Sequence, residues 1–206
     1  MVGGEREPEQ HPLQHEPSHD DAGAVILGPA GIRVYDDVIS RPMFDEIALA
    51  IRMRGWSYGW KSNTELPFGH WNISFGGRKR ANRSPCIDEL SDPLRAIWTA
   101  VQPVVMPETP TLIRCYANAH TFGIEGHVHV DSAVKTDQTA VTYLVENWTR
   151  DWAGELLFFN EDEVMFAVTP KFLRTVVFPS HLPHAARAIS RLCPFTRECF
   201  VFKAAT

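Results

Sequence analysis

A histidine and an aspartate lie two positions apart in the stretch Gly126-His-Val-His-Val-Asp131. Side chains of an extended strand alternate between its two faces, so His129 and Asp131 would project from the same face, about 7 Å apart. An imidazole and a carboxylate on one face supply two of the three ligands of a facial metal site, and His184 is the candidate for the third. Two histidines and one carboxylate, with other positions open, suit non-haem Fe(II) used in oxygen chemistry.

Two neighbouring histidines compete for the metal-binding role. His127 shares the strand face of His129, and His181 precedes His184 in the run Phe-Pro-Ser-His-Leu-Pro-His. We expect His127 to lie behind a ligand or at the mouth of the site rather than on the metal. The ligand set also suits Zn(II), so the residues alone leave a zinc hydrolase open.

Short strands separated by turns fill the chain from Thr111 onward, which is the pattern of a sandwich or barrel. A double-sheet jelly roll of eight such strands has a mouth wide enough for a metal and a small cosubstrate. We therefore expect a mainly β (α+β) fold, with a double-stranded β-helix (jelly roll, cupin-like) core and flanking N-terminal helices. The expected strands cover 112–118, 125–131, 139–145, 154–160, 163–168, 174–179, 184–190 and 196–203.

Ahead of this core, the sequence predicts two strands and two helices. Ser40 and Pro42 predict the start of a helix and Gly55 its end, because these residue types favour those positions. The aromatic-rich segment 56–75 reads as irregular, so that it either plugs the core beneath a loop or covers the mouth as a lid. The other expected elements are strands at 24–27 and 32–35 and a helix at 88–102.

The length of 206 residues fits one domain with a substantial core. Residues 1–22 are rich in Glu, Pro, Gln, His and Asp and cannot support a packed structure, which predicts a disordered N-terminal tail. Prolines in this tail interrupt any helix that would align its three histidines as a metal stripe, namely His11, His15 and His19. The predicted organisation is a tail at 1–22 and a single domain at 23–206, with the β core at about 111–203.

Composition narrows the possible partners and compartment. A net charge of −5 argues against a nucleic-acid partner, and the cluster Arg78-Lys-Arg80 with Arg83 reads as a solvated loop. No apolar run has the length of a membrane span, and the N-terminus does not resemble a signal peptide. The four cysteines form no C-x-x-C pair and read as free thiols, so we expect a cytoplasmic protein without a membrane partner.

Several motifs of the β core occur in a familiar order. Along the chain they are Arg114-Cys-Tyr116, His129-x-Asp131, Tyr143-Leu144, Trp152-x-Gly154-Glu-Leu156, Phe178-Pro179, His184 and Arg197-x-Cys-x-x-Phe202. This order resembles the 2-oxoglutarate and Fe(II)-dependent oxygenases, in particular their prolyl 4-hydroxylase-like branch, over roughly residues 112–203. The sequence departs from the family pattern in three places: Ala153 stands in place of a glycine, Val145 in place of an asparagine, and the segment between His184 and Arg197 is slightly long.

The resemblance selects a ligand set. It implies Fe(II) bound by His129, Asp131 and His184, and its spacing favours His184 over His181. It also implies 2-oxoglutarate and O₂ as cosubstrates.

The resemblance also implies how 2-oxoglutarate is held. Arg197 matches the family's carboxylate-binding residue, a role that suits the bidentate guanidinium. Arg187 and Arg191 are nearer to His184 but are expected to face solvent. Tyr143 matches a tyrosine that assists at the same carboxylate, and Tyr116 one near the iron and ketoacid. Each tyrosine has the alternative role of filling the barrel.

The implied activity is that of a dioxygenase that hydroxylates an unactivated C–H bond of a small molecule, for instance in natural-product biosynthesis, with release of succinate and CO₂. A carboxylate at Asp131 argues for hydroxylation over halogenation, while desaturation, ring closure and demethylation stay open. The alternatives are a protein hydroxylase acting on prolyl or other side chains and a non-catalytic cupin-like binding protein. Arg114 and Asn118 share a strand face with Tyr116, and an additional arginine there would suit an acidic substrate.

Overall fold

Two antiparallel sheets form the protein in the computed structural model, which describes residues 25–62, 67–77 and 83–206. Within these residues the larger sheet has the strand order β1 (Val25–Leu27), β2 (Arg33–Tyr35), β9 (Thr175–Pro179), β6 (Gln138–Tyr143), β11 (Arg197–Ala205), β5 (Thr111–His120), β4 (His70–Gly76) and β3 (Ser57–Trp60). The smaller sheet has the order β10 (His184–Ala186), β7 (Leu156–Asn160) and β8 (Glu163–Val168).

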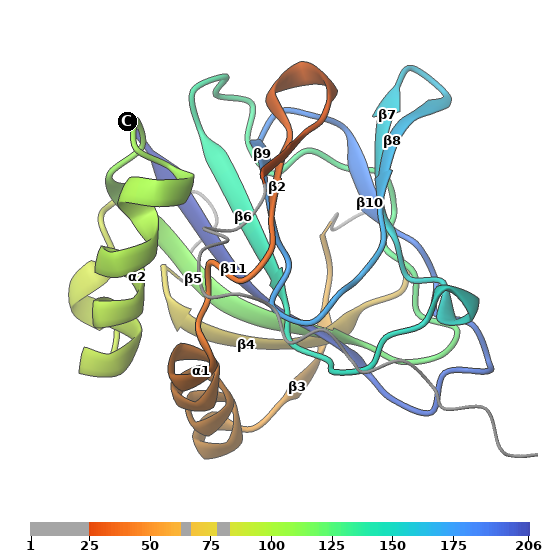
Figure 1. The fold of residues 1–206 in the computed structure, drawn as a ribbon, viewed down its shortest axis with the longest axis horizontal. Helices are drawn as coiled ribbons and strands as arrows, with labels where there is room; N and C mark the ends of the chain where they lie inside the picture. The colour runs from red at the N-terminus through yellow and green to blue at the C-terminus, as the bar shows by residue number, and fades with distance from the viewer. Residues whose placement is uncertain (1–24, 63–66, 78–82) are drawn as a thin grey trace, which may run out of the picture.

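Helices α1 (Arg41–Arg54) and α2 (Asp92–Val105) lie together on one side of the larger sheet, and the smaller sheet lies on the other side (Figure 1). This arrangement confirms the predicted double-sheet jelly roll with flanking helices. It divides the interior into a helix-to-sheet core and a sheet-to-sheet core.

Strand β11 lies between β5 and β6 in the larger sheet and contributes to both cores. Because side chains alternate along a strand, Phe200 and Phe202 pack toward the helices. Cys199 and Val201 pack toward the smaller sheet. The strand is therefore apolar over most of its length, and the polar side chains on its inner face stand out.

The first helix begins and ends as the sequence predicts. The Ser40 hydroxyl accepts a hydrogen bond from the Met43 amide, Pro42 lies in the first turn, and Gly55 caps the end with a φ of 70°. The second helix begins later than predicted, at Asp92, after a short 3-10 turn at Ile87–Glu89. The physical reason is Pro93, which fits the first helical turn and not a helix interior.

The aromatic segment 56–75 is not irregular, contrary to expectation. It contains β3 and β4, which extend one edge of the larger sheet. In β4, Ile73 and Phe75 pack toward the helices, while His70 lines the cavity between the sheets. The alternation of apolar and polar residues from 70 to 76 was readable as a strand, but the density of aromatic residues obscured it.

The strand predicted at 125–131 is also absent as a regular element. The chain there forms an isolated bridge, His129 to His184, with further backbone hydrogen bonds from Gly126 to Ala186 and from Asp131 to Ser180. Its valines, Val128 and Val130, are 51% and 48% exposed, so the segment has no apolar side chains to hold it flat against a core. The strand predicted at 184–190 is correspondingly limited to β10.

Some predictions fall on residues outside the described ranges. These are the tail at 1–22 with its three histidines, and Arg78, Lys79 and Arg80. Arg83 is described and forms an ion pair with Asp137, so it is not simply solvated. All four cysteines are free. In the described part of the chain, no helix has the length and apolar character needed to cross a membrane.

The helix-to-sheet core allows a stability prediction. Phe200 is 1% exposed and its ring lies 5.7 Å from that of Phe75 and 5.0 Å from that of Phe202. Phe200→Ala should lower the free energy of unfolding by about 3–5 kcal/mol, because it removes a large buried ring and leaves a cavity. Urea denaturation measures the change. The matched control is Phe68→Ala at a site 68% exposed, which should change stability by no more than about 0.5 kcal/mol; equal effects would contradict the described packing.

Candidate metal centre

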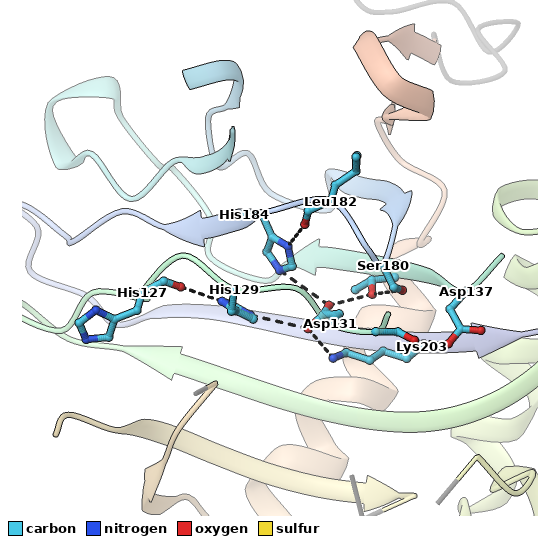
Figure 2. A network of polar contacts seen from close by, with 10 residues as sticks. His127, His129, Asp131, Asp137, Ser180, Leu182, His184 and Lys203 are labelled. Carbon is cyan, nitrogen blue, oxygen red and sulfur yellow. Dashed lines mark hydrogen bonds and ion pairs between the residues drawn. The ribbon is translucent and has the colours of Figure 1, made fainter. Parts of the chain in front are cut away.

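Three side chains converge at the mouth of the space between the sheets. Ligand atoms of His129, Asp131 and His184 all lie within 4.8 Å of one another. The Nε2 atoms of His129 and His184 are each 3.7 Å from an Asp131 carboxylate oxygen, one on Oδ1 and the other on Oδ2. Figure 2 shows both rings directed at the carboxylate. The expected triad is thus brought together although its first segment is not a regular strand.

Backbone carbonyls orient both imidazole rings. His129 Nδ1 lies 2.7 Å from the His127 carbonyl oxygen, and His184 Nδ1 lies 2.8 Å from that of Leu182. A carbonyl can only accept a hydrogen bond, so each Nδ1 carries the proton. Each Nε2 therefore presents a lone pair to the centre, which is the tautomer that a metal ligand requires.

The Asp131 carboxylate is held at both oxygens. Oδ1 lies 2.5 Å from Lys203 Nζ, and Oδ2 accepts a hydrogen bond of 2.8 Å from Thr139, whose hydroxyl also contacts Ser180 at 2.9 Å (Figure 2). Burial would raise the pKa of Asp131, but Lys203, followed by the two histidines, holds this pKa well below its usual value. The group is therefore an anion at neutral pH and a competent cation ligand.

His184 is buried against aromatic side chains, with its ring 4.7 Å from that of Phe178. Burial lowers the pKa of His184 to about 4, against the opposing attraction of Asp131. The imidazole is consequently neutral at pH 7, so a metal ion does not have to displace a proton from it.

The two rival histidines lie outside this group. In Figure 2 the His127 ring lies beyond His129, away from Asp131, and His127 contributes its backbone carbonyl instead. His181 lies in the connection between β9 and β10, and its ring is not part of the cluster found among the described residues. A place behind a ligand or at the mouth of the site stays a prediction for the His127 side chain.

A cavity of about 460 Å³ opens between the sheets beside these ligands. Its apolar wall is formed by Val141, Leu156 and Val201. Part of its polar lining comes from the inner faces of β5 and β11, which contribute Arg114, Tyr116, Asn118, His120, Arg197 and Lys203. Charged groups thus lie at both ends of this floor, and Tyr116, Asn118, Cys199 and Val201 lie between them.

Arg197 is a buried cation at one end of this floor, only 4% exposed. It donates to the Gly154 carbonyl at 2.7 Å and lies 3.4 Å from His120 Nδ1, while its Nε atom has no hydrogen-bond partner among the described residues. Burial, followed by the charges of Arg197 and His70, lowers the pKa of His120 well below its usual value, so His120 is neutral. A buried guanidinium held by neutral groups retains its charge for a ligand anion.

Close packing explains the glycine in the Gly-Glu-Leu motif. A Cβ atom on Gly154 would lie 3.0 Å from the Trp148 ring and 3.2 Å from Arg197 Cδ, and its φ of 80° already disfavours other residues. Ala153 also has a positive φ, 55°, which explains why the resembling family has glycine there. Alanine in place of glycine at position 153 therefore strains the backbone, but the loop keeps its conformation.

The two predicted tyrosines have different surroundings. Tyr143 is 2% exposed, its hydroxyl has no hydrogen-bond partner among the described residues, and burial raises its pKa. It pairs in register with Cys199, two residues from Arg197, so a hydroxyl donor lies near that cation. Tyr116 lines the cavity, with Lys203 Nζ 5.6 Å from its ring centroid.

The two arginines expected to face solvent do so. The Arg187 side chain is 59% exposed and pairs with Glu155 at 3.4 Å. Arg191 is exposed and stacks on Phe122, with its guanidinium carbon 6.0 Å from the ring centroid. Neither lines the cavity.

Lys203 is the main site residue that sequence reasoning missed. It lies on the inner face of β11, in alternation with Arg197, Cys199 and Val201, and its side chain is 9% exposed. The sequence did contain an indication of this role, because Lys203 follows Arg197 by six positions in a largely apolar strand. His120, opposite Arg197 on β5, was missed as well because only strand pairing brings the two together.

The family model of the 2OG-Fe(II) oxygenase superfamily matches residues 113–200, which include all six predicted site residues. Residues 113–200 belong to this superfamily. This superfamily match implies an oxygenase that uses Fe(II), 2-oxoglutarate and O₂, and the cluster of His129, Asp131 and His184 is its candidate iron site. No curated protein sequence matches the chain.

Solved structures show the same fold at low sequence identity. A Pseudomonas putida prolyl-4-hydroxylase is 16% identical, with a TM-score of 0.60, over 86% of this chain and 93% of that one. A 2OG-Fe(II) oxygenase family protein from Burkholderia pseudomallei is 12% identical, with a TM-score of 0.67, over 86% of both chains. An α-ketoglutarate-dependent epimerase from nogalamycin biosynthesis is 10% identical, with a TM-score of 0.60, over 85% of this chain and 78% of that one.

The lowered pKa values of His184 and His120 predict how the metal-free protein responds to pH. Below pH 6.5 the unfolded chain binds protons at these histidines while the folded protein does not, which for His184 holds down to about pH 4. The free energy of unfolding should therefore fall as the pH falls through this window, by up to about 1.4 kcal/mol per pH unit for each histidine. Urea titrations of the metal-free protein across this range measure the slope. His120→Asn should reduce it, and an unchanged slope would contradict the buried, neutral state of His120.

Proposed function

We propose that the enzyme hydroxylates an unactivated C–H bond of a small molecule, with Fe(II) held by His129 Nε2, His184 Nε2 and the Asp131 carboxylate. The observation that carries this proposal is the convergence of three ligand atoms within 4.8 Å. Each is oriented by its own hydrogen bond, so the site is organised before a metal binds.

The same proposal assigns 2-oxoglutarate to the part of the cavity beside Arg197. Its far carboxylate would pair with the Arg197 guanidinium and accept a hydrogen bond from the Tyr143 hydroxyl. Two buried donor atoms, Arg197 Nε and Tyr143 Oη, have no partner among the described residues, which supports a ligand at this end. Tyr116, nearer to Lys203 on the cavity floor, would contact the ketoacid end of the cosubstrate.

When bound together, Fe(II), 2-oxoglutarate and O₂ supply the oxidation of a C–H bond coupled to conversion of 2-oxoglutarate into succinate and CO₂. The chain's own residues bind and orient these groups. Val141, Leu156 and Val201 contribute apolar lining to the cavity in which these groups would bind. Asp131 would serve as the third protein ligand of Fe(II), and a carboxylate at this position favours hydroxylation over halogenation.

The cavity supports a small substrate. Its volume of about 460 Å³ lies in the range of small-molecule sites. The second candidate is a protein side-chain hydroxylase, because the similar folds include a prolyl-4-hydroxylase as well as an enzyme of natural-product biosynthesis. A non-catalytic barrel is disfavoured because it has no use for a buried, uncompensated Arg197 beside three potential metal ligands.

Loss of a ligand should prevent metal binding without unfolding the protein. Titration of the anaerobic Fe(II) protein with 2-oxoglutarate should produce a visible charge-transfer band, and oxygenation should release succinate. His129→Ala and Asp131→Ala should weaken Fe(II) binding by more than about 100-fold, beyond the loss typical of supporting residues, and should abolish both signals.

The matched control is His127→Ala, which removes a neighbouring ring but leaves the backbone carbonyl that orients His129. It should retain the band. Wild-type turnover in His129→Ala or Asp131→Ala would show that the metal is bound elsewhere.

Arg197→Ala should act on the cosubstrate and spare the metal. Removing one partner of a buried charge pair should weaken 2-oxoglutarate binding by on the order of 100-fold, while Fe(II) affinity stays near that of the wild type. The charge-transfer band measures 2-oxoglutarate binding, and direct titration with Fe(II) measures the affinity for the metal. The matched control Arg187→Ala removes an exposed arginine near His184 and should change neither 2-oxoglutarate binding nor Fe(II) affinity. If both variants lost 2-oxoglutarate affinity equally, Arg197 would not be the residue that binds the cosubstrate.

A further inference from the structure

Arg114 lies at the end of the cavity floor opposite Arg197. In the β5–β11 register Arg114 pairs with Lys203, and His120 pairs with Arg197. Lys203 lies six positions after Arg197 along the extended strand, which corresponds to roughly 20 Å between their Cα atoms. A basic pair therefore lies at one end of the floor, and the proposed anchor for 2-oxoglutarate lies at the other.

Aromatic rings hold the Arg114 side chain in place. Its guanidinium carbon lies 4.7 Å from the centroid of Tyr116 and 5.3 Å from that of Trp60. Such stacking uses the flat faces of the guanidinium and leaves its N–H edge for hydrogen bonds. Arg114 Nε is nevertheless buried without a hydrogen-bond partner, and no ion pair to Arg114 occurs among the described residues.

Among the described residues that line the cavity, every acidic group is already paired with a group other than Arg114. Two carboxylates of the described residues line it, those of Asp131 and Asp137. Asp131 is paired with Lys203, and Asp137 forms two hydrogen bonds with Arg83 and accepts another from Ser132. A partly buried guanidinium without an acid is unfavourable, and a bound anion would compensate it.

The position of Arg114 relates this anion to the proposed metal. Lys203, its partner across the strands, contacts Asp131 and lies 5.6 Å from the same Tyr116 ring on which Arg114 stacks. A ligand anchored on Arg114 would extend directly toward the metal ligands. Its carboxylate would lie at the end of the floor opposite Arg197, the proposed anchor for the far carboxylate of 2-oxoglutarate.

We propose that Arg114 binds the carboxylate of the substrate, so that the enzyme acts on a small carboxylic acid at a carbon near its carboxylate. This inference rests on the proposed function and specifies the substrate class of the same site. The stacked, planar guanidinium recognises the carboxylate as a bidentate partner, and Trp60 forms part of the wall against which the substrate packs.

The test uses the full-length protein with Fe(II) and 2-oxoglutarate bound under anaerobic conditions. The probes are free amino, hydroxy, aromatic and short aliphatic carboxylic acids, each beside its primary amide. Binding is followed by the change in the charge-transfer band and in tryptophan fluorescence, and oxygenation then shows which probes stimulate succinate release. At least one acid should bind at least about 10-fold more tightly than its amide.

Arg114→Gln should weaken binding of that acid by on the order of 100-fold and remove the preference for acid over amide. The 2-oxoglutarate titration should change by less than about 2-fold, which shows that the variant is folded with an intact metal site. Arg114→Lys should recover part of the affinity, because it keeps the charge but not the planar pair of donors. Arg52→Gln, an exposed arginine on α1, is the matched control and should bind as the wild type does.

Three results would overturn the inference while leaving the proposed function intact. They are equal binding of every acid and its amide, an acid preference that survives in Arg114→Gln, and stimulation only by peptides with internal acidic residues. Failure of the wild-type protein to form the charge-transfer band is a different result, because it would overturn the proposed function itself and the inference with it.

Discussion

The Asp131 carboxylate is the group on which the arrangement of the site depends. One oxygen contacts Lys203 on β11, and the other accepts a hydrogen bond from Thr139 on β6. The Asp131 amide also donates to the Ser180 carbonyl. An irregular segment is thereby attached to two strands of the larger sheet, and the buried anion faces the two histidine Nε2 atoms.

Strand β11 connects this centre to the rest of the protein. Its outer face, with Phe200 and Phe202, holds the sheet to the helices, and its inner face places Arg197 and Lys203 at opposite ends of the cavity floor. Strand alternation accounts for both roles, because each face receives every second residue. The rigidity of the two cores is what keeps the charged groups of the floor at fixed separations.

Much of the fold could be predicted from local patterns. The start of α1 followed from Ser40 and Pro42, and the jelly roll followed from the succession of short strands after Thr111. The prediction of a strand at 125–131 was wrong. Apolar residues alternate there with polar ones, but Val128 and Val130 have no core to pack against, so no regular strand forms. The segment 56–75 was misread because its hairpin is stabilised by pairing with β5, a partner far away in the sequence.

The sequence by itself determined the family order of motifs and the candidate residues of the site, since these depend on residue type and spacing. Tertiary structure alone decided that Lys203 meets Asp131, that His120 lies against Arg197, and that Arg114 Nε is buried without a hydrogen-bond partner among the described residues. Such facts depend on the register between strands and on which charges are already paired. Both are properties of contacts between distant segments, and no local pattern encodes them.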